Sequence, residues 1–284
     1  MSRLPNDITL GPVKVSVGNL ARAADFYTGV LGFEQLSSSP GTVLLGAGVK
    51  TLIALFEKPG AKPQPRHSTG LYHIAVLLPT RADLARLIIH LAQTKYPLSG
   101  YSDHLVSEAF YLNDPDGNGL ELYRDRPRSE WPRADGGMVR MDNAPIDFDD
   151  FFATAEQEAK TWSGMPAGTS IGHLHLKVGH SDLARNFYGD VIGFDVMAYF
   201  PGAAFVSAGG YHHHLGMNQW ESRGATEPPE DSVGLIEWSI VVPDAATLGE
   251  IEKRALEASA LLERGEAFVL IEDPWHTKVR VTTG

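Results

Sequence analysis

An internal repeat constrains the fold of this chain more than any other feature of its sequence. The segment from Gly11 to Phe33 recurs in part between Gly172 and Phe194, at a constant offset of 161 positions and without a gap. The shared residues include a Val-Gly pair, a Phe-Tyr pair and a closing Gly-Phe pair. Such self-similarity predicts that the two segments fold alike.

Each copy has the pattern of a strand followed by a helix. Apolar and polar residues alternate over 13–17 and 174–178, which predicts strands, and helices are expected over 20–28 and 182–189. Further short strands are predicted over 42–45, 51–56, 204–207 and 211–217.

Two weaker copies complete the pattern. Each has a strand, a helix and two more strands, with a Pro after the first strand and an Asp-Pro turn before the last. Their predicted elements are strands 71–78, 108–113, 120–123, 235–242, 267–272 and 278–282, and helices 81–93 and 246–259.

The order of elements predicts an α+β fold of four βαβββ modules. We expect consecutive modules to pair, which gives an N-terminal domain over 8–125 and a C-terminal domain over 170–284. Residues 126–169 break the pattern and are interpreted as a connector with a helix over 149–160.

Composition excludes several classes of function. A formal net charge of −11 without a basic run argues against nucleic acid as a partner. The chain has no cysteine, so a metal would need His, Asp, Glu, Tyr or backbone oxygen as ligands. We see no secretory signal and no apolar run long enough to span a membrane, and we expect a cytoplasmic protein.

The motifs resemble the vicinal oxygen chelate superfamily, which includes glyoxalase I, extradiol dioxygenases and fosfomycin- or bleomycin-resistance proteins. The resemblance rests on Val-Gly-x7-Phe-Tyr-x2-Val-[Leu/Ile]-Gly-Phe after a strand and on the Asp-Pro-Asp-Gly-Asn-Gly-Leu-Glu-Leu stretch at 114–122. The chain is most similar to four-module bacterial proteins of the catechol 2,3-dioxygenase-like type. The resemblance implies glyoxalase-type domains with open, U-shaped barrels and a divalent metal on the concave face.

Strand alternation indicates which side chains share that face. In the C-terminal half it turns His173, either His212 or His214, and Glu237 toward one cavity. Two imidazoles and a carboxylate suit Fe(II), and also Mn(II), Zn(II) or Ni(II). His213 is expected to point away, although a bulge would reverse that choice.

A complementary pair lies in the N-terminal half. His73 opens the first strand of module two and Glu121 lies on its last strand, so both match superfamily ligand positions. Module one has no ligand at its corresponding position, and this site is interpreted as secondary and degenerate. In extradiol dioxygenases, the ligands come from the first strand of one module and from the first and last strands of the next. Here Arg280 stands where the last of these is expected.

Other residues are candidates for acid–base work and substrate binding. His175, His276 and Tyr199 are expected to transfer protons, and Arg280 to bind an anionic oxygen. The function favoured is extradiol cleavage of a catechol-like aromatic by O₂ in aromatic catabolism. The alternatives are a glyoxalase-type lyase or isomerase with Zn, Ni or Mn, and a non-catalytic protein that binds a small molecule. The sequence leaves open whether the chain forms a homo-oligomer.

Overall fold

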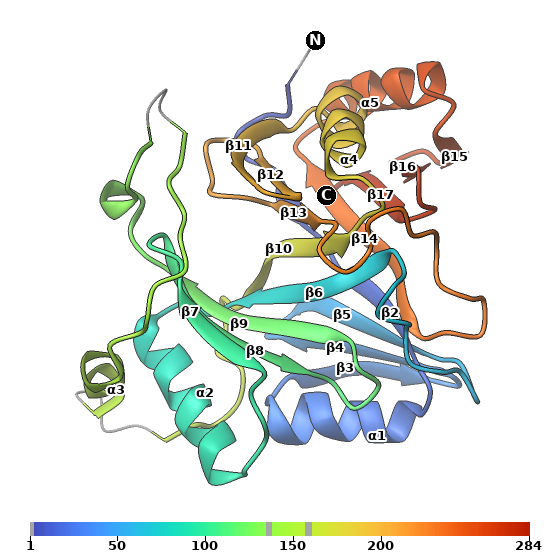
Figure 1. Ribbon diagram of the computed structural model, residues 1–284. Coiled ribbons are helices and arrows are strands. Elements are labelled where there is room, and N and C mark those ends of the chain that lie inside the picture. The colour runs from blue at the N-terminus through green and yellow to red at the C-terminus, as the bar shows by residue number, and fades with distance from the viewer. Residues whose placement is uncertain (1–2, 135–137, 157–160) are drawn as a thin grey trace.

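The structure is a computed structural model that describes residues 3–134, 138–156 and 161–284. It contains the four predicted βαβββ repeats (Figure 1). A short strand, β1 (Thr9–Leu10), precedes them. Repeat one comprises β2 (Val13–Val17), α1 (Leu20–Asp25), β3 (Glu34–Ser39), β4 (Thr42–Ala47) and β5 (Lys50–Glu57). Repeat two comprises β6 (Gly70–Leu77), α2 (Arg81–Gln93), β7 (Gly100–Asp103), β8 (Ser107–Asn113) and β9 (Gly119–Asp125).

The second half of the chain repeats this order after α3 (Phe148–Glu156). Repeat three comprises β10 (Ser170–Lys177), α4 (Ser181–Phe187), β11 (Asp195–Phe200), β12 (Ala203–Ser207) and β13 (Leu215–Asn218). Repeat four comprises β14 (Gly234–Val242), α5 (Ala245–Glu257), β15 (Leu261–Arg264), β16 (Phe268–Glu272) and β17 (Lys278–Thr283).

Local sequence explains where the helices begin and end. The side chain of Thr80 accepts a hydrogen bond from the amide of Asp83, and this N-cap starts α2 at the predicted residue. Helices α1 and α4 each continue into a π-helical turn, Phe26–Val30 and Tyr188–Ile192. The turn carries the repeated Tyr, whose ring is fully buried in both copies.

One strand of each predicted repeat was assigned no residue range from the sequence. These strands, β3, β7, β11 and β15, lie at the outer ends of the two sheets. The side chains of β3 and β15 are almost all exposed, so they lack the apolar alternation that marks a strand packed on a core.

The sheets correct the predicted domain organisation, because consecutive repeats do not pair. One sheet has the order β15-β16-β17-β14-β2-β5-β4-β3, so repeats one and four form it, with β1 against β14. The other has the order β11-β12-β13-β10-β6-β9-β8-β7 and is formed by repeats two and three. We call these the 1+4 sheet and the 2+3 sheet. The predicted division at 8–125 and 170–284 therefore cuts across both sheets. Within each sheet, the two repeats join through their first strands.

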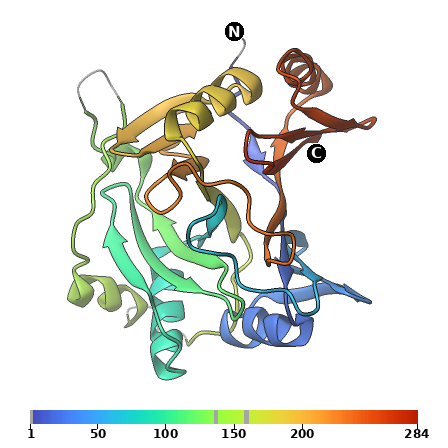
Figure 2. The same cartoon turned by 45° about the vertical axis from the view of Figure 1, so that its right-hand side comes forward.

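The core lies on the face of each sheet that the helices cover (Figures 1 and 2). Alternation on the central strands of the 2+3 sheet sends Ile74, Val76, Leu174 and Leu176 to that face, all nearly inaccessible to solvent. Each such side chain contributes roughly 1.5–3 kcal/mol through burial. One continuous apolar cluster includes residues of both sheets. The opposite, concave face of the 2+3 sheet carries polar residues.

The connector is more than a plain linker. It runs along the outer edge of the 2+3 sheet beyond β7, and its helix α3 packs on α2 (Figures 1 and 2). The backbones of Asp103 and Ala144 form a bridge between the connector and β7. The predicted connector helix over 149–160 corresponds to α3, and residues 157–160 lie outside the described residues. Among the described helices, none is long and apolar enough to cross a membrane.

Candidate metal centre

Three buried residues of the 2+3 sheet converge on one point of its concave face: His73, Glu121 and His173. They come from β6, β9 and β10, which are adjacent in the sheet. Ala75 pairs with Glu121 on one side and with His173 on the other. His73, two residues before Ala75, points to the same face. Strand register therefore brings together residues that lie up to 100 positions apart.

The three groups have the spacing of a ligand set. His73 Nε2 lies 2.9 Å and His173 Nε2 lies 3.1 Å from the same oxygen, Oε2 of Glu121. One ligand atom from each residue lies within 4.8 Å of the others. Two imidazoles and one carboxylate on one side of a point form the facial set used for Fe(II), with the other side open.

An unpartnered nitrogen indicates that a metal fits here. His73 Nε2 is buried and makes no hydrogen bond, although the carboxylate oxygen lies beside it. Leaving a buried polar atom unpaired costs about 1–3 kcal/mol. A divalent cation between the three side chains would satisfy this nitrogen, and His73, His173 and Glu121 are therefore the residues that would hold it.

The protonation states also suit a metal. Burial would raise the pKa of Glu121, but the neighbouring His173 and His73 hold it well below its usual value. Burial lowers the pKa of His173 to about 4, against the opposing effect of Glu121. Near neutral pH the site therefore offers a carboxylate and a neutral imidazole, the forms that bind metals.

A second group of polar side chains surrounds these three. His175 lies opposite His73 in the sheet and is hydrogen bonded through Nε2 to the side-chain amide of Asn218 at 3.0 Å. Gly216 makes room for this ring, since a Cβ at Gly216 would lie 3.0 Å from the imidazole. The ring of His213 lies 4.1 Å from that of His173. Burial and nearby imidazoles lower the pKa values of His175 and His213 well below the usual value, so both rings are neutral near pH 7.

Hydrogen bonds fix the position of these groups. His213 Nδ1 lies 2.8 Å from His212 Nδ1, and His212 Nε2 lies 2.8 Å from a carboxylate oxygen of Asp125. On the other side, the hydroxyl of Tyr111 lies 2.6 Å from His104 Nε2. Burial, followed by the charge of Glu121, raises the pKa of Tyr111 well above its usual value, so the phenol keeps its proton.

The three candidate ligands and four of the surrounding residues border a cavity of about 590 Å³; the four are His104, Tyr111, His175 and His213. The volume lies in the range that proteins use to bind small molecules. Connector residues Met141, Asp142 and Asn143 form part of its wall. Neither the connector nor His104, Tyr111 and His213 was a predicted part of the site.

The predicted site in the C-terminal half needs correction. Glu237 lies on β14 of the 1+4 sheet, where its carboxylate pairs with Lys14 at 2.8 Å and with Arg280 at 2.7 Å. It does not meet His173, which lies in the other sheet. The guanidinium of Arg280 donates hydrogen bonds to Glu237 and lies over the Phe268 ring. Arg280 is not among the residues that border the cavity.

The histidine run was also assigned to the wrong faces. Residues 211–214 precede β13 and are not part of a strand, so alternation does not apply to them. His213 borders the cavity, whereas His212 is bound to Asp125 and His214 Nδ1 lies 2.7 Å from the hydroxyl of Ser207. His214 stacks beside Phe194 and is not among the residues that border the cavity.

Two of the predicted acid–base residues lie elsewhere. Tyr199 is half exposed, with the guanidinium of Arg185 over its ring. His276 lies after the Asp-Pro turn that precedes β17 and pairs with Glu272. His173 and His175 occupy the concave face as predicted, because both lie within the regular part of β10.

The 1+4 sheet carries an ion-pair cluster at the position that corresponds to the candidate metal centre. Glu237 lies opposite Lys14, as His73 lies opposite His175. Arg280 pairs beside Ser239, as Glu121 pairs beside Ala75. One sheet thus holds a ligand set and the other an ion-pair cluster. The ligand set combines His73 and Glu121 of the predicted secondary site with His173 of the predicted primary site.

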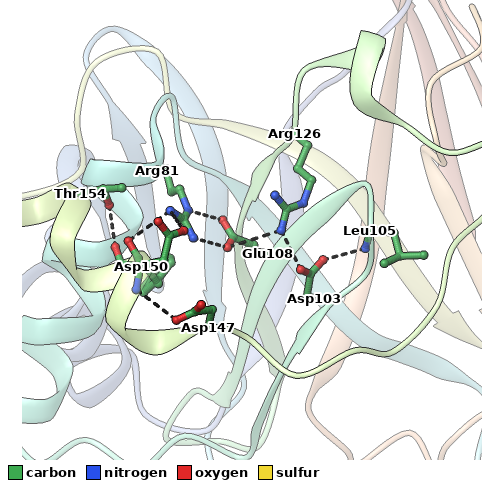
Figure 3. Close-up of polar contacts among 9 residues, drawn as sticks. Arg81, Asp103, Leu105, Glu108, Arg126, Asp147, Asp150 and Thr154 are labelled. Atoms are coloured by element: carbon green, nitrogen blue, oxygen red, sulfur yellow. Dashed lines mark hydrogen bonds and ion pairs between the residues drawn. The ribbon is translucent and has the colours of Figure 1, made fainter.

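A network of ion pairs fixes the turn next to the cavity (Figure 3). The buried carboxylate of Glu108 takes two hydrogen bonds from Arg81, which also binds Asp150 of α3. Arg126 binds Asp103 at 2.6 Å, and Asp103 accepts a hydrogen bond from the amide of Leu105 (Figure 3). The network therefore holds α3 and the turn that carries His104.

Comparison with known proteins identifies the family. The model of the Glyoxalase/Bleomycin resistance protein/Dioxygenase superfamily matches residues 9–122. A catechol-2,3-dioxygenase of Bacillus subtilis (strain 168) is 40% identical over 278 residues, which cover 96% of each chain. This chain belongs to the glyoxalase/bleomycin resistance protein/dioxygenase superfamily. The predicted resemblance is confirmed.

Solved structures agree with the fold. A proposed dioxygenase from Bacillus subtilis subsp. subtilis str. 168 superimposes with a TM-score of 0.66 at 14% identity, over 99% of this chain and 86% of the other. Glyoxalase I from Zea mays gives a TM-score of 0.60 at 15% identity, over 98% and 92% of the two chains. The predicted glyoxalase-type fold is confirmed.

Proposed function

We propose that this protein is a metal-dependent oxidoreductase that opens a catechol-like ring with O₂, with Fe(II) held by His73, His173 and Glu121. The observation that carries the proposal is the convergence of two buried imidazoles and a carboxylate, one nitrogen without a partner, at a cavity. The similarity to a catechol-2,3-dioxygenase over nearly the whole chain supports an extradiol dioxygenase-like enzyme.

The ligand strands support the same reading. The superfamily's dioxygenases take ligands from the first strand of one module and from the first and last strands of its partner. His173 lies on the first strand of repeat three, and His73 and Glu121 lie on the first and last strands of repeat two. These two repeats form one sheet, so the pattern is complete once the pairing is known.

The metal would supply a place where the two oxygens of the diol and O₂ are held side by side. The chain's own residues handle the proton. His213 is neutral and borders the cavity. Because His212 Nε2 donates to Asp125, His212 Nδ1 accepts from His213 Nδ1, and His213 Nε2 is left to accept a proton from a diol hydroxyl. His175 Nε2 already accepts a hydrogen bond from the Asn218 amide, so His175 lines the cavity without acting as the base. Tyr111 keeps its proton and donates it to His104 Nε2, because His104 Nδ1 donates to the backbone oxygen of Asp142, and the phenol oxygen is left as an acceptor at the cavity.

The proposal predicts which carboxylate binds the metal. Chains carrying Glu121→Gln or His173→Ala, purified without oxygen and titrated with Fe(II), are expected to bind iron more weakly by at least about a hundredfold. Iron per chain and O₂ uptake with catechol measure the effect. Glu237→Gln is the matched control, because its carboxylate lies in the ion-pair cluster of the other sheet.

Three results would contradict the proposal. Loss of iron from Glu237→Gln but not from Glu121→Gln would place the site in the 1+4 sheet. Turnover without O₂ in a Zn- or Ni-loaded protein would favour the glyoxalase-type alternative. Tight binding of a small molecule without any metal would favour a binding protein.

A further inference from the structure

The charge of the cavity wall bears on the kind of substrate that fits it. Among the residues that the structure describes, no lysine or arginine borders the cavity, and its charged residues are Glu121 and Asp142. His104 has both ring nitrogens occupied, by the backbone oxygen of Asp142 and the hydroxyl of Tyr111. An anionic group on a substrate would therefore lose water without gaining a counter-charge.

The mouth of the cavity has the opposite character from its polar floor. Tyr72, Tyr101, Phe200 and Trp220 border it and expose 37%, 53%, 37% and 54% of their surface. They come from β6, β7, the end of β11 and the segment after β13. Large aromatic surfaces left open around a cavity indicate an apolar ligand.

The aromatic residues lie close enough to act as one surface. The rings of Tyr72 and Trp220 are 6.0 Å apart and pack at steep angles, and both lie within 6 Å of the His175 ring. Elsewhere along the cavity wall, Phe200 packs against Phe205 with ring centroids 5.5 Å apart, and Phe205 contacts both His175 and His213. An apolar wall thus extends from the neutral imidazoles at the floor to the rim.

We infer that the substrate is an uncharged aromatic diol with an apolar substituent that lies against this wall, rather than a diol that carries a carboxylate. The inference rests on the proposed function, since the diol is placed at His73, His173 and Glu121. A cavity of about 590 Å³ is larger than a bare catechol ring requires. Its remaining space is bordered by aromatic rings and carries no fixed positive charge.

A matched pair of ligands tests the charge. 3,4-Dihydroxybenzoate and its methyl ester differ in charge at one position. Calorimetric titration of the Fe(II) protein without oxygen is expected to give a dissociation constant at least about tenfold lower for the ester, and kcat/KM should favour it similarly. Met141→Arg, which places a cation at the wall, is expected to remove most of the difference.

Neighbouring residues on β11 test the apolar wall. Phe200 borders the cavity, whereas Tyr199 points to the other side of the strand under Arg185. Phe200→Ala and Trp220→Ala are expected to weaken binding of 4-tert-butylcatechol about threefold to tenfold more than binding of catechol itself. Tyr199→Ala, the matched control, should leave both unchanged.

The outcomes separate the two proposals. If the ester binds more tightly than the acid but no diol is opened, the proposed reaction fails and the substrate class stands. If catechol is opened but the acid binds as tightly as the ester, the substrate class is wrong and the reaction stands. If neither the acid nor the ester binds, this result also contradicts the proposed substrate class.

Discussion

Small residues decide whether the ligands of this site can meet. Ala75 lies in register between Glu121 and His173, on the same face as His73. Its methyl group leaves the space between the three larger side chains free. A longer side chain there would project into the point on which they converge.

Ala75→Leu is therefore expected to abolish iron binding while the chain still folds, at a cost of about 1–3 kcal/mol from overpacking. Iron per chain and circular dichroism measure the two effects. Ser239→Leu is the matched control, since Ser239 holds the corresponding register position beside Arg280 in the 1+4 sheet. It should lower stability comparably and leave iron binding intact, and equal loss of iron in both variants would contradict the role of Ala75.

At this scale, sequence reasoning succeeded where the strand is regular. Alternation placed His173 and His175 on the concave face because β10 continues through both. It failed for the run 212–214, which lies in a turn. His73 and Glu121 were recognised as matching ligand positions, but nothing in their local sequence shows that their partner is His173.

At the scale of elements, the connector and the turn after β7 shape the cavity from outside the repeats. Arg81 at the start of α2 joins Glu108 of β8 to Asp150 of α3 (Figure 3). The side chain of Glu108 is 2% exposed, so its carboxylate needs Arg81 and Arg126 as ion-pair partners. Removing the nearer partner, Arg81, leaves the buried carboxylate with the more distant Arg126, at 3.7 Å.

Arg81→Ala is expected to lower the free energy of unfolding by about 3 kcal/mol, because it breaks a buried pair from one side. Urea unfolding measures this. Asp182→Ala removes an exposed pair with Arg185 and should cost less than about 1 kcal/mol. A similar small loss for both variants would show that Glu108 is stabilised by other means.

The order of the elements and the bounds of α2 were the parts of the fold that sequence predicted best. Helix α2 begins and ends where its cap and periodicity indicated. The outermost strands β3 and β15 were given no residue range because their side chains face solvent on both sides. The lining role of residues 141–143 also left no pattern, since it depends on where a loop crosses the sheet.

For the whole molecule, the pairing of repeats is the property that sequence could not supply. Four similar units allow more than one way to join first strands, and the repeat pattern is the same in each. The pairing decided the site: it separates His173 from Glu237 and joins His173 to His73.

The ion-pair cluster of the 1+4 sheet predicts a pH dependence of stability. Burial would raise the pKa of Glu237, but hydrogen bonds from Arg280 and Lys14 lower it below its usual value. A carboxylate with a depressed folded pKa stabilises the fold above its unfolded pKa of about 4.3 and loses that effect as pH falls through the folded value.

Glu237→Gln should therefore be less stable than the parent chain at neutral pH, with the difference shrinking below about pH 4. Urea unfolding of both metal-free chains from pH 7 down to pH 3.5 measures it. A difference that stays constant across this range would show that the charge of Glu237 does not contribute.

The nested pairing also sets an order in which the chain can be completed during synthesis. The 2+3 sheet has all of its strands once β13 has emerged at Asn218, whereas β2, already paired with β5, meets its second neighbour only when β14 follows. The first repeat made is thus the last to find its partner, and until then one edge of β2 lies open to other chains. A nascent chain that has emerged past β13 but not yet as far as β14 would therefore have every strand of the 2+3 sheet and an incomplete 1+4 sheet.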